Sequence, residues 1–117
     1  MTTILTELSP TKLPKSLTRC GYRLDQIHRS PNAAVYSVTD IETGTAHGFE
    51  VFQIKVQSER TTPNGIHFAH KERYPANEDF GVWAFAPRTK EKAFQIFGEM
   101  EIKAIREKPI EAFELAI

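Results

Sequence analysis

The sequence predicts an α+β domain: an antiparallel sheet of four to five strands, one main C-terminal amphipathic helix packed on one face, and a short N-terminal helix. Three observations support this prediction. Apolar and β-branched residues form three consecutive strand-like segments between residues 22 and 57. Apolar residues recur at three- and four-residue steps between residues 90 and 107. Seven of the eight Phe residues and the single Trp lie between positions 49 and 97, which places the core there.

The chain of 117 residues is long enough for one domain with a modest core. Residues 1–12 are rich in Thr and lack a clear period, so we expect a loosely held N-terminal arm. Residues 13–107 form the single α+β domain, and residues 108–117 form a C-terminal tail. Pro14 suits the first position of a helix and Gly21 suits the position just after one, so we expect the short helix over 14–20.

Two segments, 22–29 and 33–40, flank the turn-forming residues Ser30, Pro31 and Asn32. Both segments are therefore expected to be strands. After a turn at 41–45, a third strand is expected over 48–57, covered on both faces at its start. The three strands form an antiparallel meander.

The stretch 58–80 is the least regular. Pro63, Asn64 and Gly65 indicate a turn, and a short extra hairpin is expected around them. Residues 73–81 mix Pro, Asn, Asp and Gly with aromatic residues, so an ordered loop pinned by Tyr74 and Phe80 is predicted. A short strand follows over 82–86.

Thr89 is placed to cap the main helix, which is expected to run to about residue 107 because Pro109 prevents simple continuation. Gly98 inside it costs about 1 kcal/mol relative to Ala unless a neighbouring backbone must approach closely. Residues 110–117 fit either a strand or a further helical turn.

Lys and Arg number 15 and Asp and Glu number 15, so the formal charge is zero. This balance argues against a strongly basic duplex-DNA binder and a polybasic membrane-surface protein. Residues 1–36 nevertheless hold five basic and two acidic side chains. The longest wholly apolar run has five residues, far fewer than the roughly 20 of a membrane-spanning helix. With no signal-peptide pattern at the start, we expect a cytoplasmic protein with no membrane partner.

Cys20 is the only cysteine, so an intramolecular disulfide and a Cys-based metal site are both excluded. His67 and His70 lie three residues apart with Glu72, Glu78 and Asp79 downstream, which raises the hypothesis of a small hydrolase or metal enzyme. Residues three apart on a strand point to opposite faces, so solvated loop histidines are the favoured interpretation. Neither catalytic residues nor a metal or cofactor are predicted.

Aromatic and basic residues on the sheet give a second hypothesis, in which single-stranded nucleic acid stacks on exposed rings. The residues that would carry it are Arg19, Arg23, Arg29, Tyr36, Lys55 and Trp83. The competing interpretation is that strand aromatics simply fill the core. The sequence alone leaves both open.

Four stretches carry a resemblance: LPKSLTRCGY (13–22), GFEVFQIKV (48–56), ERYPANEDFGVWAF (72–85) and KEKAFQIF (90–97). In order and spacing the chain resembles small uncharacterised proteins encoded by bacteriophages and prophages, over roughly residues 13–100. The resemblance implies a fold shared by small accessory proteins and a phage or mobile-element origin. It transfers no activity.

We therefore expect a small non-enzymatic accessory protein that binds a macromolecular partner, most simply a protein, and that inhibits a host or defence factor. An ordered loop rich in polar and aromatic residues is where binding sites concentrate. The residues expected to contact the partner are Arg73, Tyr74, Asn77, Glu78, Asp79 and Phe80. Open sheet edges are also compatible with a homodimer.

Overall fold

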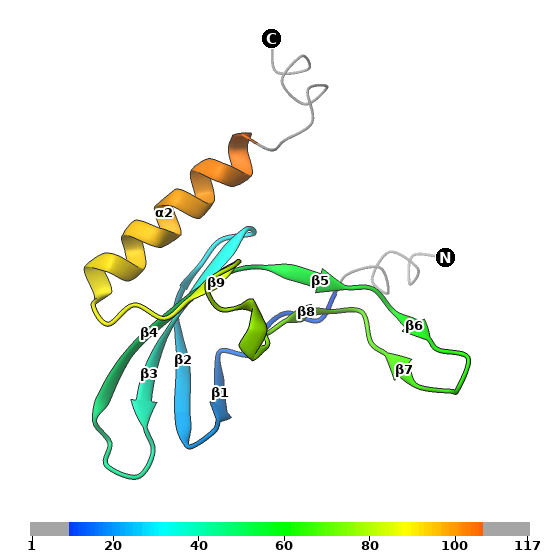
Figure 1. Ribbon diagram of the computed structural model, residues 1–117, viewed down its shortest axis with the longest axis horizontal. Helices are drawn as coiled ribbons and strands as arrows, with labels where there is room; N and C mark the ends of the chain where they lie inside the picture. The colour runs from blue at the N-terminus through cyan, green and yellow to red at the C-terminus, as the bar shows by residue number, and fades with distance from the viewer. Residues whose placement is uncertain (1–9, 107–117) are drawn as a thin grey trace.

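The computed structural model describes residues 10–106. An α+β fold is confirmed: a five-stranded antiparallel sheet with the order β1-β2-β3-β4-β9 and one C-terminal helix (Figure 1). The strands of this sheet are β1 (Ser16–Arg19), β2 (Tyr22–Arg29), β3 (Ala33–Asp40), β4 (Ala46–Gln53) and β9 (Ala84–Phe85). The helix is α2 (Lys90–Arg106). The predicted 110–117 element and most of the N-terminal arm lie outside the described residues.

The short N-terminal helix predicted over 14–20 is wrong, because this segment forms strand β1. Arg19 pairs with Tyr22 across a two-residue turn made by Cys20 and Gly21. Their φ angles are 51° and 85°, and positive φ at both central residues fits the right-handed twist of a hairpin. Gly21 does supply a left-handed conformation, but it closes a hairpin instead of a helix.

The meander expected between residues 22 and 57 is confirmed, and strands β2 and β3 have the predicted bounds. Ser30 holds the connection between them, since its hydroxyl accepts hydrogen bonds from the N–H groups of Asn32 and Ala33 at 3.0 and 3.2 Å. The Asp40 carboxylate organises the next turn in the same way. Local side-chain hydrogen bonds therefore fix both hairpin connections.

The third expected strand divides at Ile54. Strand β4 ends at Gln53, and the chain then leaves the sheet to form a protruding ribbon (Figure 1). The ribbon contains two short antiparallel pairs, whose members are β5 (Lys55–Gln57) with β8 (Lys71–Arg73) and β6 (Arg60–Thr61) with β7 (His67–Phe68). The predicted hairpin turn closes its tip, where the Thr62 N–H donates to the Ile66 carbonyl at 2.8 Å.

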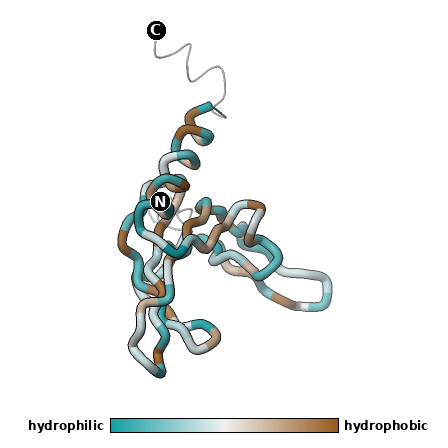
Figure 2. Tube along the Cα trace, turned by 60° about the vertical axis from the view of Figure 1, so that its left-hand side comes forward, coloured by the Kyte–Doolittle hydropathy of each residue, from teal (hydrophilic) through white to brown (hydrophobic). Residues whose placement is uncertain are grey.

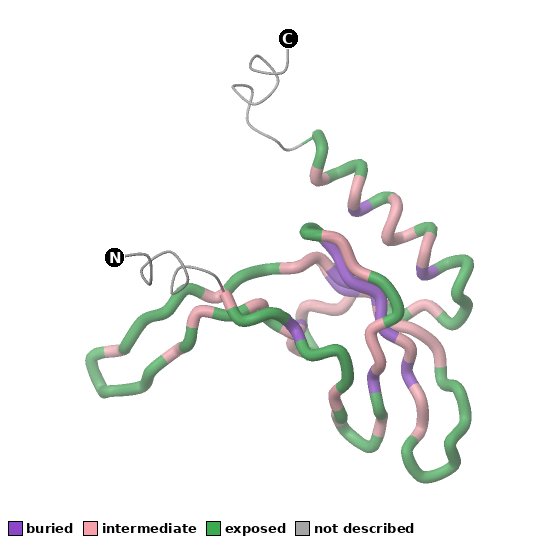
Figure 3. The backbone as a smooth tube through the Cα atoms, turned by 180° about the vertical axis from the view of Figure 1, so that it is seen from behind, coloured by how far each residue is buried: buried purple, intermediate pink, exposed green. Residues whose placement is uncertain are grey.

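Helix α2 covers one face of the sheet, as predicted. Ala93 and Met100 are buried on it and pack with Ala33, Val35 and Val51 of the central strands. The Thr89 hydroxyl accepts a hydrogen bond from the N–H of Lys92 at 3.2 Å, which confirms the predicted cap. Buried residues concentrate in β3 and β4, whereas the ribbon is mostly exposed (Figure 3).

The opposite face is covered by two chain segments that are distant in sequence. Leu13 comes from the N-terminal side, and Tyr74 and Phe80 come from the predicted ordered loop; all three pack with a cluster of buried residues centred on Tyr36 and Phe52. Both aromatic anchors of the loop are thus confirmed. The loop contains a 3₁₀ turn, η1 (Asn77–Asp79), and the predicted strand over 82–86 is reduced to the two residues of β9.

Candidate functional site

A cleft of about 500 Å³ opens where the β1–β2 turn, the start of β4 and the segment after β8 meet. Arg19 and Tyr22 border it from the hairpin, because the tight turn at Cys20 and Gly21 places both beside it. Segments 46–50, 74–77 and 86–88 complete its walls. With Val38 of β3, the cleft combines residues from five parts of the chain.

A polar network lies along one wall. Tyr74 donates its hydroxyl hydrogen bond to the Glu50 carboxylate. The Arg19 guanidinium lies 4.9 Å from the centre of the Tyr74 ring, and its Nη2 donates to Asn77 Oδ1 at 2.6 Å. Phe52 supports the Tyr74 ring edge-to-face at 5.5 Å. This wall is therefore fixed before any ligand arrives.

Burial raises the pKa of Glu50 above its ordinary value, and the hydrogen bond from Tyr74 opposes that shift. Burial also raises the pKa of the Tyr74 hydroxyl, and its hydrogen bond to Glu50 adds to the rise. Tyr74 therefore remains a neutral donor to the carboxylate at neutral pH.

The other wall carries two groups from separate segments. The His47 ring packs against Tyr22 in a tilted arrangement, with ring centres 4.6 Å apart. Arg88 is exposed, and among residues 10–106 it has no carboxylate within ion-pair distance. Arg19 likewise contacts a ring and amide oxygens but forms no ion pair with a described carboxylate. Two guanidinium groups thus line one cleft without a direct ion pair to a described carboxylate, and the charge of Glu50 in the same cleft acts on Arg19.

The residues predicted to contact a partner divide between two places. Tyr74 and Asn77 line the cleft. Phe80 packs on the core, and Asp79 accepts a hydrogen bond from the Ala76 N–H at 2.8 Å, so both mainly hold the loop. Glu78 is exposed on η1, whereas Arg73 lies on the ribbon side, 6.0 Å from the Trp83 ring centre.

The residues of the nucleic-acid hypothesis are also dispersed. Tyr36 has no exposed surface and its hydroxyl donates to the Pro14 carbonyl at 2.6 Å, so this ring is a core residue and cannot stack on a base. Arg23 pairs with Asp25 on the surface. Lys55 and Trp83 lie together, with the ammonium 5.3 Å from the indole centre.

His67 and His70 occupy the ribbon and its base. His67 contacts Glu59 at 3.4 Å and Thr61 at 3.1 Å. Within the part of the chain that the structure describes, no three His, Cys, Asp or Glu side chains lie close enough together to hold a metal ion. Cys20 is exposed at the rim of the cleft.

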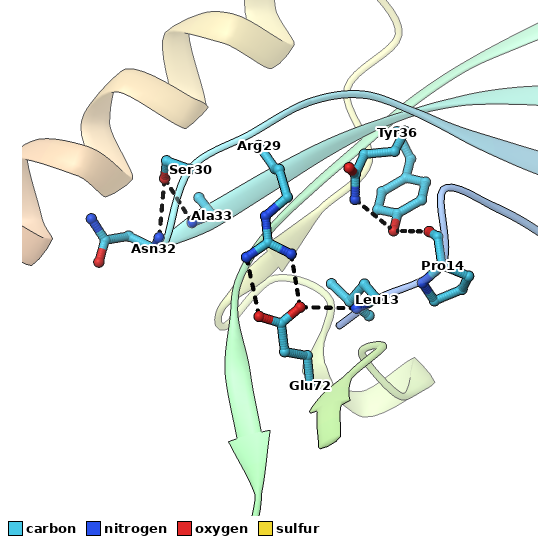
Figure 4. A network of polar contacts seen from close by, with 9 residues as sticks. Leu13, Pro14, Arg29, Ser30, Asn32, Ala33, Tyr36 and Glu72 are labelled. Carbon is cyan, nitrogen blue, oxygen red and sulfur yellow. Dashed lines mark hydrogen bonds and ion pairs between the residues drawn. The ribbon is translucent and has the colours of Figure 1, made fainter. Parts of the chain in front are cut away.

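The shortest ion pair within residues 10–106, between Arg29 and Glu72, was not predicted from the sequence. Glu72 accepts two hydrogen bonds from Arg29, at 2.8 and 3.1 Å, and a third from the Leu13 N–H at 2.9 Å (Figure 4). The Glu72 side chain is only 7% exposed, and the hydrogen bonds from Arg29 lower its pKa. This contact is structural, because it joins the ribbon base to the sheet and to the N-terminal segment.

No helix within residues 10–106 is long and apolar enough to cross a membrane. Comparison with protein families, with curated proteins and with solved structures finds no match to this chain.

Proposed function

We propose that this protein is a non-enzymatic binding module that captures a protein partner in the cleft between Arg19, Tyr74 and Arg88. The part of the partner that enters the cleft is an acidic segment. The observation that carries the proposal is the pair of cations, Arg19 and Arg88, that line one concave surface, neither with a described carboxylate within ion-pair distance. Arg is well suited to bind carboxylates because its planar donors match their geometry.

The remaining polar groups favour recognition over chemistry. Glu50 is engaged by Tyr74, and Asn77 is engaged by Arg19, so these side chains are held by each other. A wall that is already ordered loses little conformational entropy when a ligand binds, which favours affinity. The resemblance to phage-encoded accessory proteins suggests which kind of protein the partner is. We propose a host or defence factor, which this protein inhibits by binding it.

The single cysteine provides a sharp test. Cys20 is exposed at the rim of the cleft, so a maleimide photo-crosslinker attached there samples only the immediate surroundings. We expect irradiation in host lysate to yield one dominant adduct, and the Arg88→Ala variant to abolish it. The adduct should carry the crosslink in an acidic segment.

Arg106 at the end of α2 gives the matched controls, because it is also exposed. The Arg106→Ala variant should retain the Cys20 adduct. A Cys20→Ser, Arg106→Cys variant carrying the same crosslinker should not form it. An adduct that survives Arg88→Ala, or that forms equally from position 106, would refute the cleft as the binding site.

A further inference from the structure

The ribbon formed by β5, β6, β7 and β8 extends away from the sheet and its core, as the views in Figures 1 and 2 show. Lys55 pairs with Arg73, and Gln57 pairs with Lys71. Directly paired residues share a face, as do residues two apart along a strand. These four side chains therefore lie on one face of the ribbon.

The opposite face is occupied differently. Val56 pairs with Glu72 there, and Glu72 is bound to Arg29. The acidic side chain of β8 is thus turned away from the cationic face and paired with Arg29. This leaves the face that contains Lys55 and Lys71 positive.

A hollow of about 460 Å³ continues this face toward the tip. It is lined by Gln57, Ser58, Arg60, Phe68 and Arg73. Arg60 lines this hollow together with Arg73, and because Arg60 and Lys55 are five residues apart, their Cα atoms lie at most about 17 Å from each other. We refer to Lys55, Arg60, Lys71 and Arg73 as the ribbon strip.

Each end of the ribbon strip is associated with an aromatic ring. The Arg60 guanidinium lies 4.7 Å from the centre of Phe68. At the base, Lys55 and Arg73 lie over Trp83 at 5.3 and 6.0 Å. Proteins bind single-stranded nucleic acid with aromatic side chains placed beside basic ones, because the phosphates contact the cations and the bases stack on the aromatic rings.

The cations of the ribbon strip are largely unneutralised, although the chain as a whole has no net charge. All four side chains belong to exposed residues. Among the residues that the structure describes, only Arg73 has a carboxylate within 4.0 Å, that of Asp79. The strip is therefore a local positive surface of the kind that attracts a phosphate backbone.

We infer that the ribbon strip binds single-stranded nucleic acid, with phosphates on Lys55, Arg60, Lys71 and Arg73 and bases against Phe68 and Trp83. The site is separate from the cleft of the proposed function and does not depend on it. A strip of this length accommodates a few nucleotides, near the lower limit of known single-strand site sizes.

The test uses the full chain and a fluorescein-labelled oligothymidylate of about 12 nucleotides, with a duplex of equal length for comparison. Fluorescence anisotropy is measured at about 50 and 200 mM NaCl. Four phosphate contacts predict that affinity falls about 50-fold between these salt concentrations. Quenching of Trp83, the only tryptophan, is followed in parallel with unlabelled oligonucleotide.

The double variant Arg60→Ala, Lys71→Ala removes two contacts. It should bind roughly 60-fold more weakly at 50 mM NaCl, and its salt dependence should fall to about sevenfold over the same range. The matched control is Lys90→Ala, Arg106→Ala, which removes two exposed cations of α2 and should bind like the wild type. Since Arg60 also packs on Phe68, Lys71→Ala is tested alone, with an expected loss of about eightfold.

Several results would overturn the inference. They are the absence of anisotropy change at 50 mM NaCl, an equal loss of affinity in the α2 control, tighter binding of the duplex than of the single strand, or unchanged Trp83 emission on saturation. The two proposals fail independently. Arg88→Ala should leave oligothymidylate binding intact, and Lys71→Ala should leave the Cys20 adduct intact.

Discussion

Replacing Glu72 removes the best-satisfied ion pair that the structure describes. The Glu72→Ala change leaves the Arg29 side chain, 22% exposed, without its carboxylate partner and leaves the Leu13 N–H without an acceptor. Breaking a buried pair by deleting one partner costs about 3–5 kcal/mol. Because Arg29 retains partial access to water, we expect the lower end, about 3 kcal/mol of unfolding free energy.

Glu72→Gln separates charge from hydrogen bonding, because the amide oxygen can still accept from Leu13. We expect a loss of about 1.5 kcal/mol. The assay is urea unfolding followed by the emission of Trp83, which packs against the core beside this region. The surface pair of Arg23 with Asp25, broken by Arg23→Ala, is the control and should change stability far less.

The pH dependence gives an independent check. The pKa of Glu72 is lowered from its ordinary 4.5, so the unfolded chain takes up this proton before the folded one does. The stabilisation from Glu72 is present above pH 4.5 and is lost as the pH falls through the lower native value. Wild-type protein should therefore lose more stability on acidification than Glu72→Gln. Two results would refute the reasoning. One is that the unfolding free energies of wild type and Glu72→Gln fall equally as the pH is lowered, and the other is that Glu72→Ala loses less than about 1 kcal/mol of unfolding free energy.

Four further changes test the fold, the first three by denaturant unfolding and the fourth by circular dichroism. Gly98→Ala should stabilise the protein by about 1 kcal/mol, because a Cβ there meets no heavy atom within 4 Å; a destabilised variant would mean that the helix packs differently. Gly48→Ala should instead destabilise, since φ is +145° and the new Cβ would lie 3.0 Å from the Pro87 carbonyl oxygen; neutrality would contradict this close approach. Tyr36→Phe should cost about 1–2 kcal/mol through its two lost hydrogen bonds, and a smaller change would mean that the hydroxyl is not essential to the core. Thr89→Ala should cost about 1 kcal/mol, mainly as reduced helix content by circular dichroism, unless another group caps the helix.

The sheet and the helix were predictable because their signals are local. Strands β2 and β3 are bounded by strong turn residues, and α2 by Thr89 at its start. The helix prediction for residues 14–20 was wrong because Gly21, whose φ is positive, suits a hairpin turn as readily as the end of a helix. Nothing local distinguishes the two uses, since the decision depends on whether the next strand folds back.

The cleft was only partly predictable. Tyr74 and Asn77 lie in a loop whose composition predicts a binding site. Arg19 also lines the cleft, but the sequence analysis names it only for single-stranded nucleic-acid binding. Glu50 was missed, although a carboxylate flanked by apolar strand residues signals a buried acid that requires a partner. Arg88 was missed because no sequence pattern indicates that residue 88 lies beside residue 19. Only the tertiary fold brings these segments together.

The order of the strands also bears on how the chain folds. Strands β1 to β4 each pair with their neighbour in sequence, so their ladders close over short connections, and we expect them to form early. The bond from Leu13 to Glu72 joins residues 59 positions apart and is expected to form last. Changes in the β2–β3 hairpin should therefore slow refolding, whereas changes at Glu72 should mainly accelerate unfolding. We therefore expect the contact of Leu13 with Glu72 to govern how long the native state persists, and the meander to govern how quickly it is reached.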